Sequence, residues 1–181
     1  MADIAYIKYN RTRKEEFQIK TEILVENGET WVEKSALSDE GTAHIRSFGD
    51  KYEALKRQHV HLKVVEPRLS DDGRTARFAY LTGKTLAEEL GEEIRTGQAP
   101  VEAIRAVVEK VCEVRPEYLA PFQITDRLTE VFGPVPKFDD QAMAVSNIDA
   151  LLENILVTED GWYFLDYEWV YDFPVPLGFV K

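Results

Sequence analysis

The feature that most constrains the fold is a run of alternating residues that leads into an Asn-Gly pair. Every second residue from Phe17 to Val25 is apolar or β-branched, which is typical of a half-buried strand. Asn27-Gly28 follows, and this dipeptide is the strongest short-range signal for a tight β-hairpin. Residues 31–37 then return as a strand, and the apolar run 5–9 precedes the pair. The chain is therefore expected to begin with three antiparallel strands.

The next fifty residues predict a helix and two further strands. The apolar stripe of the helix consists of Ile45, Phe48, Tyr52 and Leu55, at spacings of three and four. Ser38 is a suitable N-cap for it. Residues 62–66 and 75–81 have strand character and lie on either side of a turn at 70–73. Residues 1–83 are therefore expected to form a five-stranded antiparallel sheet with one helix.

From residue 84 onward the pattern becomes mainly helical. Thr85 and Glu88 form a capping-box pattern before a helix that Gly97 ends, and Pro100 suits the first turn of the next helix. Cys112 falls on the apolar face of that second helix and is expected to be a core residue. Two further elements are expected, a helix near 124–131 and a hairpin over 155–167. The predicted fold class is α+β with two lobes, in which residues 84–181 form a partial, mainly helical second lobe.

Composition excludes several classes of function. The chain has 181 residues with 33 acidic and 22 basic side chains, a formal net charge of -11, which argues against binding nucleic acid. No apolar run approaches the roughly 18 residues that a membrane span needs, and no signal-peptide pattern opens the chain. The single cysteine excludes an internal disulfide. These observations predict a cytoplasmic protein without a membrane span.

Three polar residues near the end of the chain form the strongest chemical signal. Asp149 is followed five positions later by Asn154, and twelve positions after that by Asp166. Carboxylate and amide oxygens in this small number suit Mg²⁺, which keeps several waters and relies on substrate phosphates. Asp and Asn are also common in turns, so each residue alone could be structural. A charged Asp166 within the apolar segment 163–167 is harder to explain without a ligand.

The motifs and their order resemble the protein-kinase-like fold, most closely its aminoglycoside phosphotransferase and choline kinase branch. In that branch an Asp, an aromatic residue and an acidic residue replace Asp-Phe-Gly, as Asp166-Tyr167-Glu168 does here. The resemblance implies ATP and Mg²⁺ as cofactors. It assigns Asp149 as the catalytic residue that orients the attacking hydroxyl, and Asn154 and Asp166 as metal ligands.

The resemblance also assigns a nucleotide site in the first lobe. Lys34, on the third predicted strand, matches the lysine that contacts the nucleotide phosphates, although a strand lysine can also be simply solvated. Its glutamate partner on the following helix would be Glu53, with Glu40 as the competing choice. Tyr80 and Leu81 begin the segment that would lie against adenine.

The sequence departs from the family pattern in three ways. Asn147 stands where a histidine is usual, two positions before Asp149. The loop over residues 10–16 contains no glycine, so Arg11 and Arg13 would supply charge to the phosphates instead, unless this is a solvated basic turn. The chain also ends fifteen residues after Asp166, where related kinases continue. The sequence therefore predicts a fragment of a polypeptide that has further domains.

Three functions remain open from the sequence. The first is a phosphotransferase that uses ATP and Mg²⁺ and acts on a hydroxyl of a small molecule or sugar. The second is a pseudokinase or scaffold module of a bacterial polysaccharide-modifying methyltransferase or glycosyltransferase, an association suggested by the segment 166–174. The third is an unrelated α+β domain in which the Asp and Asn spacings are coincidental.

Overall fold

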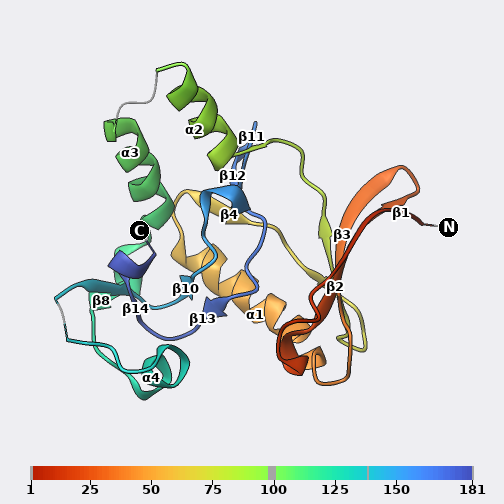
Figure 1. The fold of residues 1–181 in the computed structure, drawn as a ribbon, viewed down its shortest axis with the longest axis horizontal. Helices are drawn as coiled ribbons and strands as arrows, with labels where there is room; N and C mark the ends of the chain where they lie inside the picture. Colours follow the sequence, from red (N-terminus) through yellow and green to blue (C-terminus); the bar gives the residue numbers. More distant parts are fainter. Residues whose placement is uncertain (1, 98–100, 138, 181) are drawn as a thin grey trace. The chain divides into compact units, whose positions relative to one another are not determined.

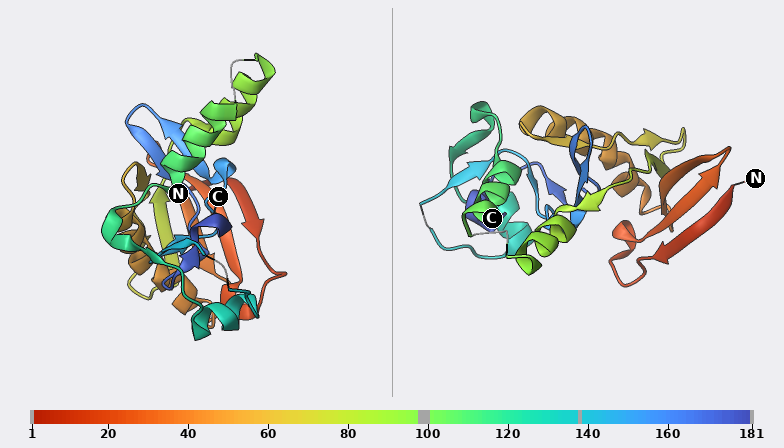
Figure 2. Two further views of the ribbon diagram at one scale, coloured as in Figure 1. Left: turned by 90° about the vertical axis from the view of Figure 1, so that its left-hand side faces the viewer. Right: turned by 90° about the horizontal axis from the view of Figure 1, so that it is seen from above.

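An antiparallel sheet of five strands, in the order β1-β2-β3-β6-β5, is formed by the first half of the chain (Figure 1). Its strands are β1 (Asp3–Tyr9), β2 (Ile19–Glu26), β3 (Glu29–Ala36), β5 (Arg68–Leu69) and β6 (Thr75–Ala79). Figure 2 shows the red and orange strands side by side. The structure is a computed structural model that describes residues 2–97, 101–137 and 139–180. Asn27 and Gly28 have φ angles of 53° and 83°, as a tight hairpin turn requires, so this prediction is confirmed.

The chain divides into two units, and one predicted strand belongs to the second of them. The first unit comprises Met1–Glu53 and Val65–Leu81, and the second comprises Ala54–Val64 and Thr82–Lys181. The segment 62–66 was expected in the first sheet, which is wrong: β4 (Leu62–Val64) runs parallel to β12 (Gly161–Phe164) in the second unit. An alternating pattern predicts a strand but does not specify its partner, which here lies about a hundred residues away.

Helix α1 (Thr42–Gln58) begins in the first unit. The four residues of its predicted stripe are all buried, and Phe48 packs edge-on against Phe78 of β6 at 5.4 Å between ring centroids. The expected cap at Ser38 is wrong, because the first helical hydrogen bond joins Ile45 N to Gly41 O. A turn in which Thr42 N donates to Asp39 O separates Ser38 from the helix.

The second unit contains α2 (Leu86–Arg95), α3 (Val101–Cys112) and α4 (Asp126–Phe132). The capping box at Thr85 and Glu88 and the burial of Cys112 are confirmed. The expected helix start at Pro100 lies outside the described residues. None of the described helices combines the length and the apolar character that a membrane crossing needs.

Short strands and 3-10 turns complete the second unit. A four-stranded sheet has the order β4-β12-β11-β7, a three-stranded sheet the order β14-β9-β8, and β10 pairs with β13. The remaining strands are β7 (Lys84–Thr85), β8 (Leu119–Pro121), β9 (Gln141–Met143), β10 (Ser146–Asn147), β11 (Ile155–Thr158), β13 (Val170–Tyr171) and β14 (Val175–Pro176). The 3-10 turns are η1 (Glu15–Phe17), η2 (Pro116–Tyr118), η3 (Leu152–Asn154) and η4 (Leu177–Phe179). The predicted hairpin over 155–167 is confirmed as β11 and β12.

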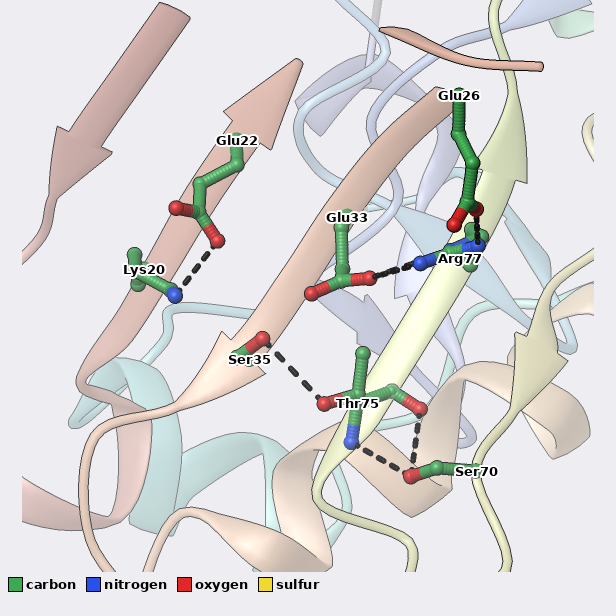
Figure 3. Close-up of polar contacts among 8 residues, drawn as sticks. All are labelled: Lys20, Glu22, Glu26, Glu33, Ser35, Ser70, Thr75 and Arg77. Carbon is green, nitrogen blue, oxygen red and sulfur yellow. Dashed lines mark hydrogen bonds and ion pairs between the residues drawn. The ribbon is translucent and has the colours of Figure 1, made fainter. Parts of the chain in front are cut away.

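Charged side chains cross the face of the first sheet opposite to α1 (Figure 3). Arg77 on β6 donates to Glu26 at 2.9 Å and, through Nε and Nη2, to Glu33 at 3.1 and 2.9 Å. Glu22 lies directly opposite Glu33 in the β2–β3 register and pairs with Lys20 at 2.6 Å. Glu22 is 5% exposed, so the two neighbouring carboxylates depend on these cations for compensation.

Arg77→Met is therefore expected to lower the free energy of unfolding by about 2 kcal/mol, because it leaves partly buried carboxylates without their cation. Urea denaturation at neutral pH measures the loss. Arg77→Lys keeps the charge but not the planar fork, so a smaller loss is expected. A Met variant as stable as the wild type would show that Arg77 contributes nothing net to the sheet.

Candidate functional site

Asp149 and Asn154 lie at the two ends of one loop in the second unit, called here the Asp149 loop (residues 149–154). The loop leaves β10, whose Asn147 is registered with Val170 of β13, and it ends in the turn η3 just before β11. Ile148 N donates to Trp169 O at 3.1 Å and continues the β10–β13 pairing up to Asp149. Strand pairing therefore fixes the main chain on both sides of the loop.

The side-chain amide of Asn154 points back into its own loop. Its Nδ2 donates to the carbonyl oxygen of Asp149 at 3.0 Å. The main-chain oxygen of Asn154 accepts from Leu165 N at 2.9 Å, which joins the loop to the residue before Asp166. Because Nδ2 is the donor in this orientation, Oδ1 is the atom of Asn154 that can serve as a ligand for a cation.

Asn147 connects Asp149 to Asp166. Its side chain is buried, with 2% exposure for the residue. Its Nδ2 donates to the main-chain oxygen of Asp166 at 3.2 Å, and its Oδ1 accepts from Asp149 N at 3.2 Å. One amide thus bridges both motifs. Asn147 stands where the resembled family usually has a histidine, and its amide can donate and accept at once, as a neutral histidine does.

Asp166 follows β12 and is half-buried between apolar neighbours. Its Oδ1 accepts from Glu168 N at 3.2 Å, a local turn that orients the carboxylate, while Tyr167 is completely buried. The pKa of Tyr171 on β13 is raised by burial and by the negative charge of Asp149. The charge of Asp149 therefore acts on a side chain of β13, the strand that pairs with β10.

The donor set of the site fits a hard cation with few protein ligands. The Asn154 amide and the Asp166 carboxylate offer oxygen atoms on segments that Asn147 and the main-chain bond from Leu165 hold together. Within the described ranges no group of three or more His, Cys, Asp or Glu side chains could hold a metal ion. A site dominated by protein carboxylates or imidazoles is therefore not seen there, whereas an Asn and Asp pair completed by water and phosphate would fit.

The first unit holds the predicted residues Lys34, Glu53 and Glu40. Lys34 on β3 is 6% exposed and lies on the sheet face that α1 covers, with its Nζ 5.6 Å from the centre of the Phe48 ring. Burial argues against a merely solvated strand lysine. Glu53 on α1 and Glu40 in the turn before it are both exposed. Which of the two serves as partner of Lys34 stays a prediction.

The loop between β1 and β2 is shaped by a glutamine in place of glycine. Gln18 Nε2 donates to the main-chain oxygens of Arg11 and Arg13 at 3.2 and 2.9 Å. The guanidinium of Arg11 lies 4.8 Å from the centre of the Tyr9 ring. At the other end of the unit Tyr80 is 44% exposed, and its N donates to Thr30 O at 3.2 Å.

The fold is of the protein-kinase-like type, as the sequence predicted. A solved structure with this fold is the apoenzyme of macrolide 2'-phosphotransferase MphH from Brachybacterium faecium. The similarity covers 98% of this chain and 70% of that one, with a TM-score of 0.50 and 12% sequence identity. No protein-family model matches the chain, and no curated protein matches it either. The shared fold argues against an unrelated α+β domain with coincidental spacings.

Proposed function

We propose that the protein is a phosphotransferase that uses ATP and Mg²⁺ and acts on a hydroxyl group of a small molecule or sugar. The observation that carries the proposal is the bridge that Asn147 makes between Asp149 and Asp166. A catalytic aspartate and a metal-binding aspartate must keep a fixed spacing, because phosphoryl transfer depends on positioning and charge rather than on covalent chemistry. The name of the structural neighbour, a macrolide 2'-phosphotransferase, is consistent with this class of reaction.

Each proposed residue has a distinct role. Asp149 would orient the acceptor hydroxyl and take its proton. Asn154 through Oδ1 and Asp166 through its carboxylate would hold Mg²⁺, which when bound offsets the negative charge of the phosphates. Lys34 would contact the phosphates from the first unit, and Glu53 would orient the lysine. Arg11, Arg13, Tyr80 and Leu81 are proposed as further nucleotide contacts.

The scaffold alternative makes a different prediction for the polar side chains. In a module kept only for interactions, Asn154 and Asp166 would be used as structural hydrogen-bond partners. The described bond of Asn154 uses Nδ2, the atom that cannot bind a cation. One bond to Asp166 Oδ1 comes from the nearby main-chain N–H of Glu168, which orients the carboxylate. Both bonds are compatible with cation binding by Asn154 Oδ1 and the Asp166 carboxylate, as the proposed enzyme needs.

Asp166→Ala is expected to abolish the thermal stabilisation that Mg²⁺ and ATP together give to the wild type, because the variant lacks a ligand for the cation. At a nucleotide concentration of 100 times Kd the wild type should gain about 2.7 kcal/mol, which a thermal-shift titration resolves easily. Titration with ATP and EDTA shows how much of the gain depends on the metal.

Glu159→Ala is the matched control, since Glu159 is an exposed carboxylate in the turn between β11 and β12 of the same unit. It should keep the full stabilisation. If the wild type gains no stability from Mg²⁺ and ATP, or if Asp166→Ala gains as much as the wild type, the proposed site is wrong.

A further inference from the structure

Gln58, the last residue of α1, is a buried polar side chain that the proposed chemistry does not use. It is completely buried in the second unit, at 0% exposure. Its Oε1 accepts from Val145 N at 2.9 Å, and its Nε2 donates to Val145 O at 2.6 Å. Both main-chain groups of Val145 therefore bond to one side chain that lies 87 residues away.

The position of Val145 gives this pairing its importance. Val145 follows β9 and comes directly before β10, so it lies two residues before Asn147. The pairing partners of the chain change at this point, because β9 pairs with β8 and β14 whereas β10 pairs with β13. The amide of Gln58 takes the place of a neighbouring strand at the junction between the two sheets.

The helix end is itself fixed to another part of the second unit. The main-chain oxygen of Gln58 accepts from Arg115 N at 2.9 Å, and the next residue, His59, forms a β-bridge with Val114. The side chain of Gln58 therefore extends from a fixed main chain, which limits the positions that Val145 can adopt. A buried amide with both of its groups bonded gives a defined geometry, whereas a half-bonded one would be strongly unfavourable.

We propose that Gln58 is a positioning residue, which sets the main chain that carries Asn147 and Asp149 and so fixes their geometry relative to Asp166. The consequence for catalysis rests on the proposed phosphotransferase function. The consequence for the main chain of the Asp149 loop does not. The two can therefore be measured separately.

Two substitutions test the proposal. Gln58→Met keeps the length of the side chain but removes the bonds to the half-buried Val145 N and O. Gln58→Glu keeps the shape, but its carboxylate cannot donate to Val145 O and places a charge in the core. When protonated, the same side chain can again donate and accept as glutamine does. Burial raises the pKa of a carboxyl group, so this glutamate should become protonated as the pH falls from about 8 to about 6. The Gln58→Glu variant should then regain its kcat relative to the wild type.

Hydrogen exchange on the full chain measures how often the main-chain amides of residues 145–154 open. In Gln58→Met the amides of residues 145–154 should exchange at least about tenfold faster than in the wild type. The amides of α2 should be unchanged. Leu128→Ala is the control for general loss of stability, since Leu128 is buried in a separate cluster with Phe173 and Val175. It should raise exchange across the second unit without a selective increase at residues 145–154.

Turnover measures the functional consequence, as ADP release with Mg²⁺ and ATP. For Gln58→Met we expect kcat to fall about a hundredfold, because catalysis is sensitive to misplacement of about 1 Å. The KM for ATP should change by less than about threefold. Gln58→Glu should regain its kcat relative to the wild type on the acidic side, whereas Leu128→Ala should keep a wild-type kcat per folded molecule.

The outcomes separate the two proposals. Unchanged exchange at residues 145–154 in Gln58→Met would overturn the positioning role, whatever the enzyme activity. Locally faster exchange in a protein whose wild type neither binds nor turns over ATP would support the positioning role and reject the phosphotransferase function. Local exchange changes with normal kcat would show that Gln58 is structural only, and so would overturn the inference.

Discussion

Asp149→Asn is expected to slow phosphoryl transfer about a thousandfold, the size of effect typical for loss of a general base. The amide has the shape of the carboxylate but cannot take a proton from the acceptor hydroxyl. The described bonds of Asp149 to Asn147 and Asn154 use its main-chain N and O, and the substitution does not remove these atoms. The fold of the loop should therefore survive while the chemistry is lost.

Binding and chemistry are measured on the same protein to test this expectation. ADP release gives the rate, and titration with Mg²⁺ and ATP gives the affinity, which should stay within about threefold of the wild type. The pH dependence is a second readout, since the wild-type rate should fall when a carboxylate base is protonated, and the residual rate of the variant should lack that limb. A variant that keeps more than about a tenth of the wild-type rate would contradict the role of Asp149 as a base.

Local sequence patterns predicted much of the fold. The Asn27-Gly28 hairpin, the capping box at Thr85 and the hairpin of β11 and β12 each depend on neighbours within a few residues, and all three are present. The predicted strand at 62–66 was assigned to the wrong sheet because its partner β12 is remote in sequence. Short patterns determine which element forms, whereas pairing between distant elements is decided by the packing of the whole unit.

The sequence pointed to candidate site residues but not to the hydrogen bonds that support them. Spacing selected Asp149, Asn154 and Asp166 as candidates, and the structure joins their segments through the bridge from Asn147 and the bond from Leu165 N to Asn154 O. The contribution of Gln58 was not predicted, although a signal for it exists in the sequence. Gln58 lies three residues after Leu55, so it extends the apolar stripe of α1 with a polar side chain. A polar residue at the end of a buried stripe indicates a hydrogen-bond partner elsewhere in the fold.

His59 should make the second unit sensitive to mild acid. The side chain is buried beside Phe164, with 5.1 Å between ring centroids, and its Nδ1 has no hydrogen-bond partner among the described residues. Burial lowers the pKa of His59 from 6.5 to about 4. In the unfolded chain the imidazole takes up a proton near its ordinary pKa, whereas the folded protein resists protonation until the pH is much lower.

The sign follows from which state binds the proton. Between the two pKa values the unfolded state carries a proton that the folded state lacks, so the free energy of unfolding decreases as the pH falls from about 6.5 to about 4. The full loss from this one group is about 3 kcal/mol, and it is complete below the folded pKa. His59→Phe keeps an aromatic ring against Phe164 and removes the proton site. We therefore expect it to lose about 3 kcal/mol less than the wild type between pH 7 and pH 4.

Tryptophan fluorescence during urea unfolding gives the measurement for the second unit. In a Trp31→Phe background the remaining tryptophans, Trp162 and Trp169, belong to that unit. His61→Gln is the matched control, because His61 is exposed and bonds Glu113 on the surface at 2.8 Å, so its effect should stay below about 1 kcal/mol. The difference between wild type and His59→Phe cancels the carboxylates that titrate over the same range. Equal acid sensitivity in these two proteins would show that His59 is not held neutral by burial.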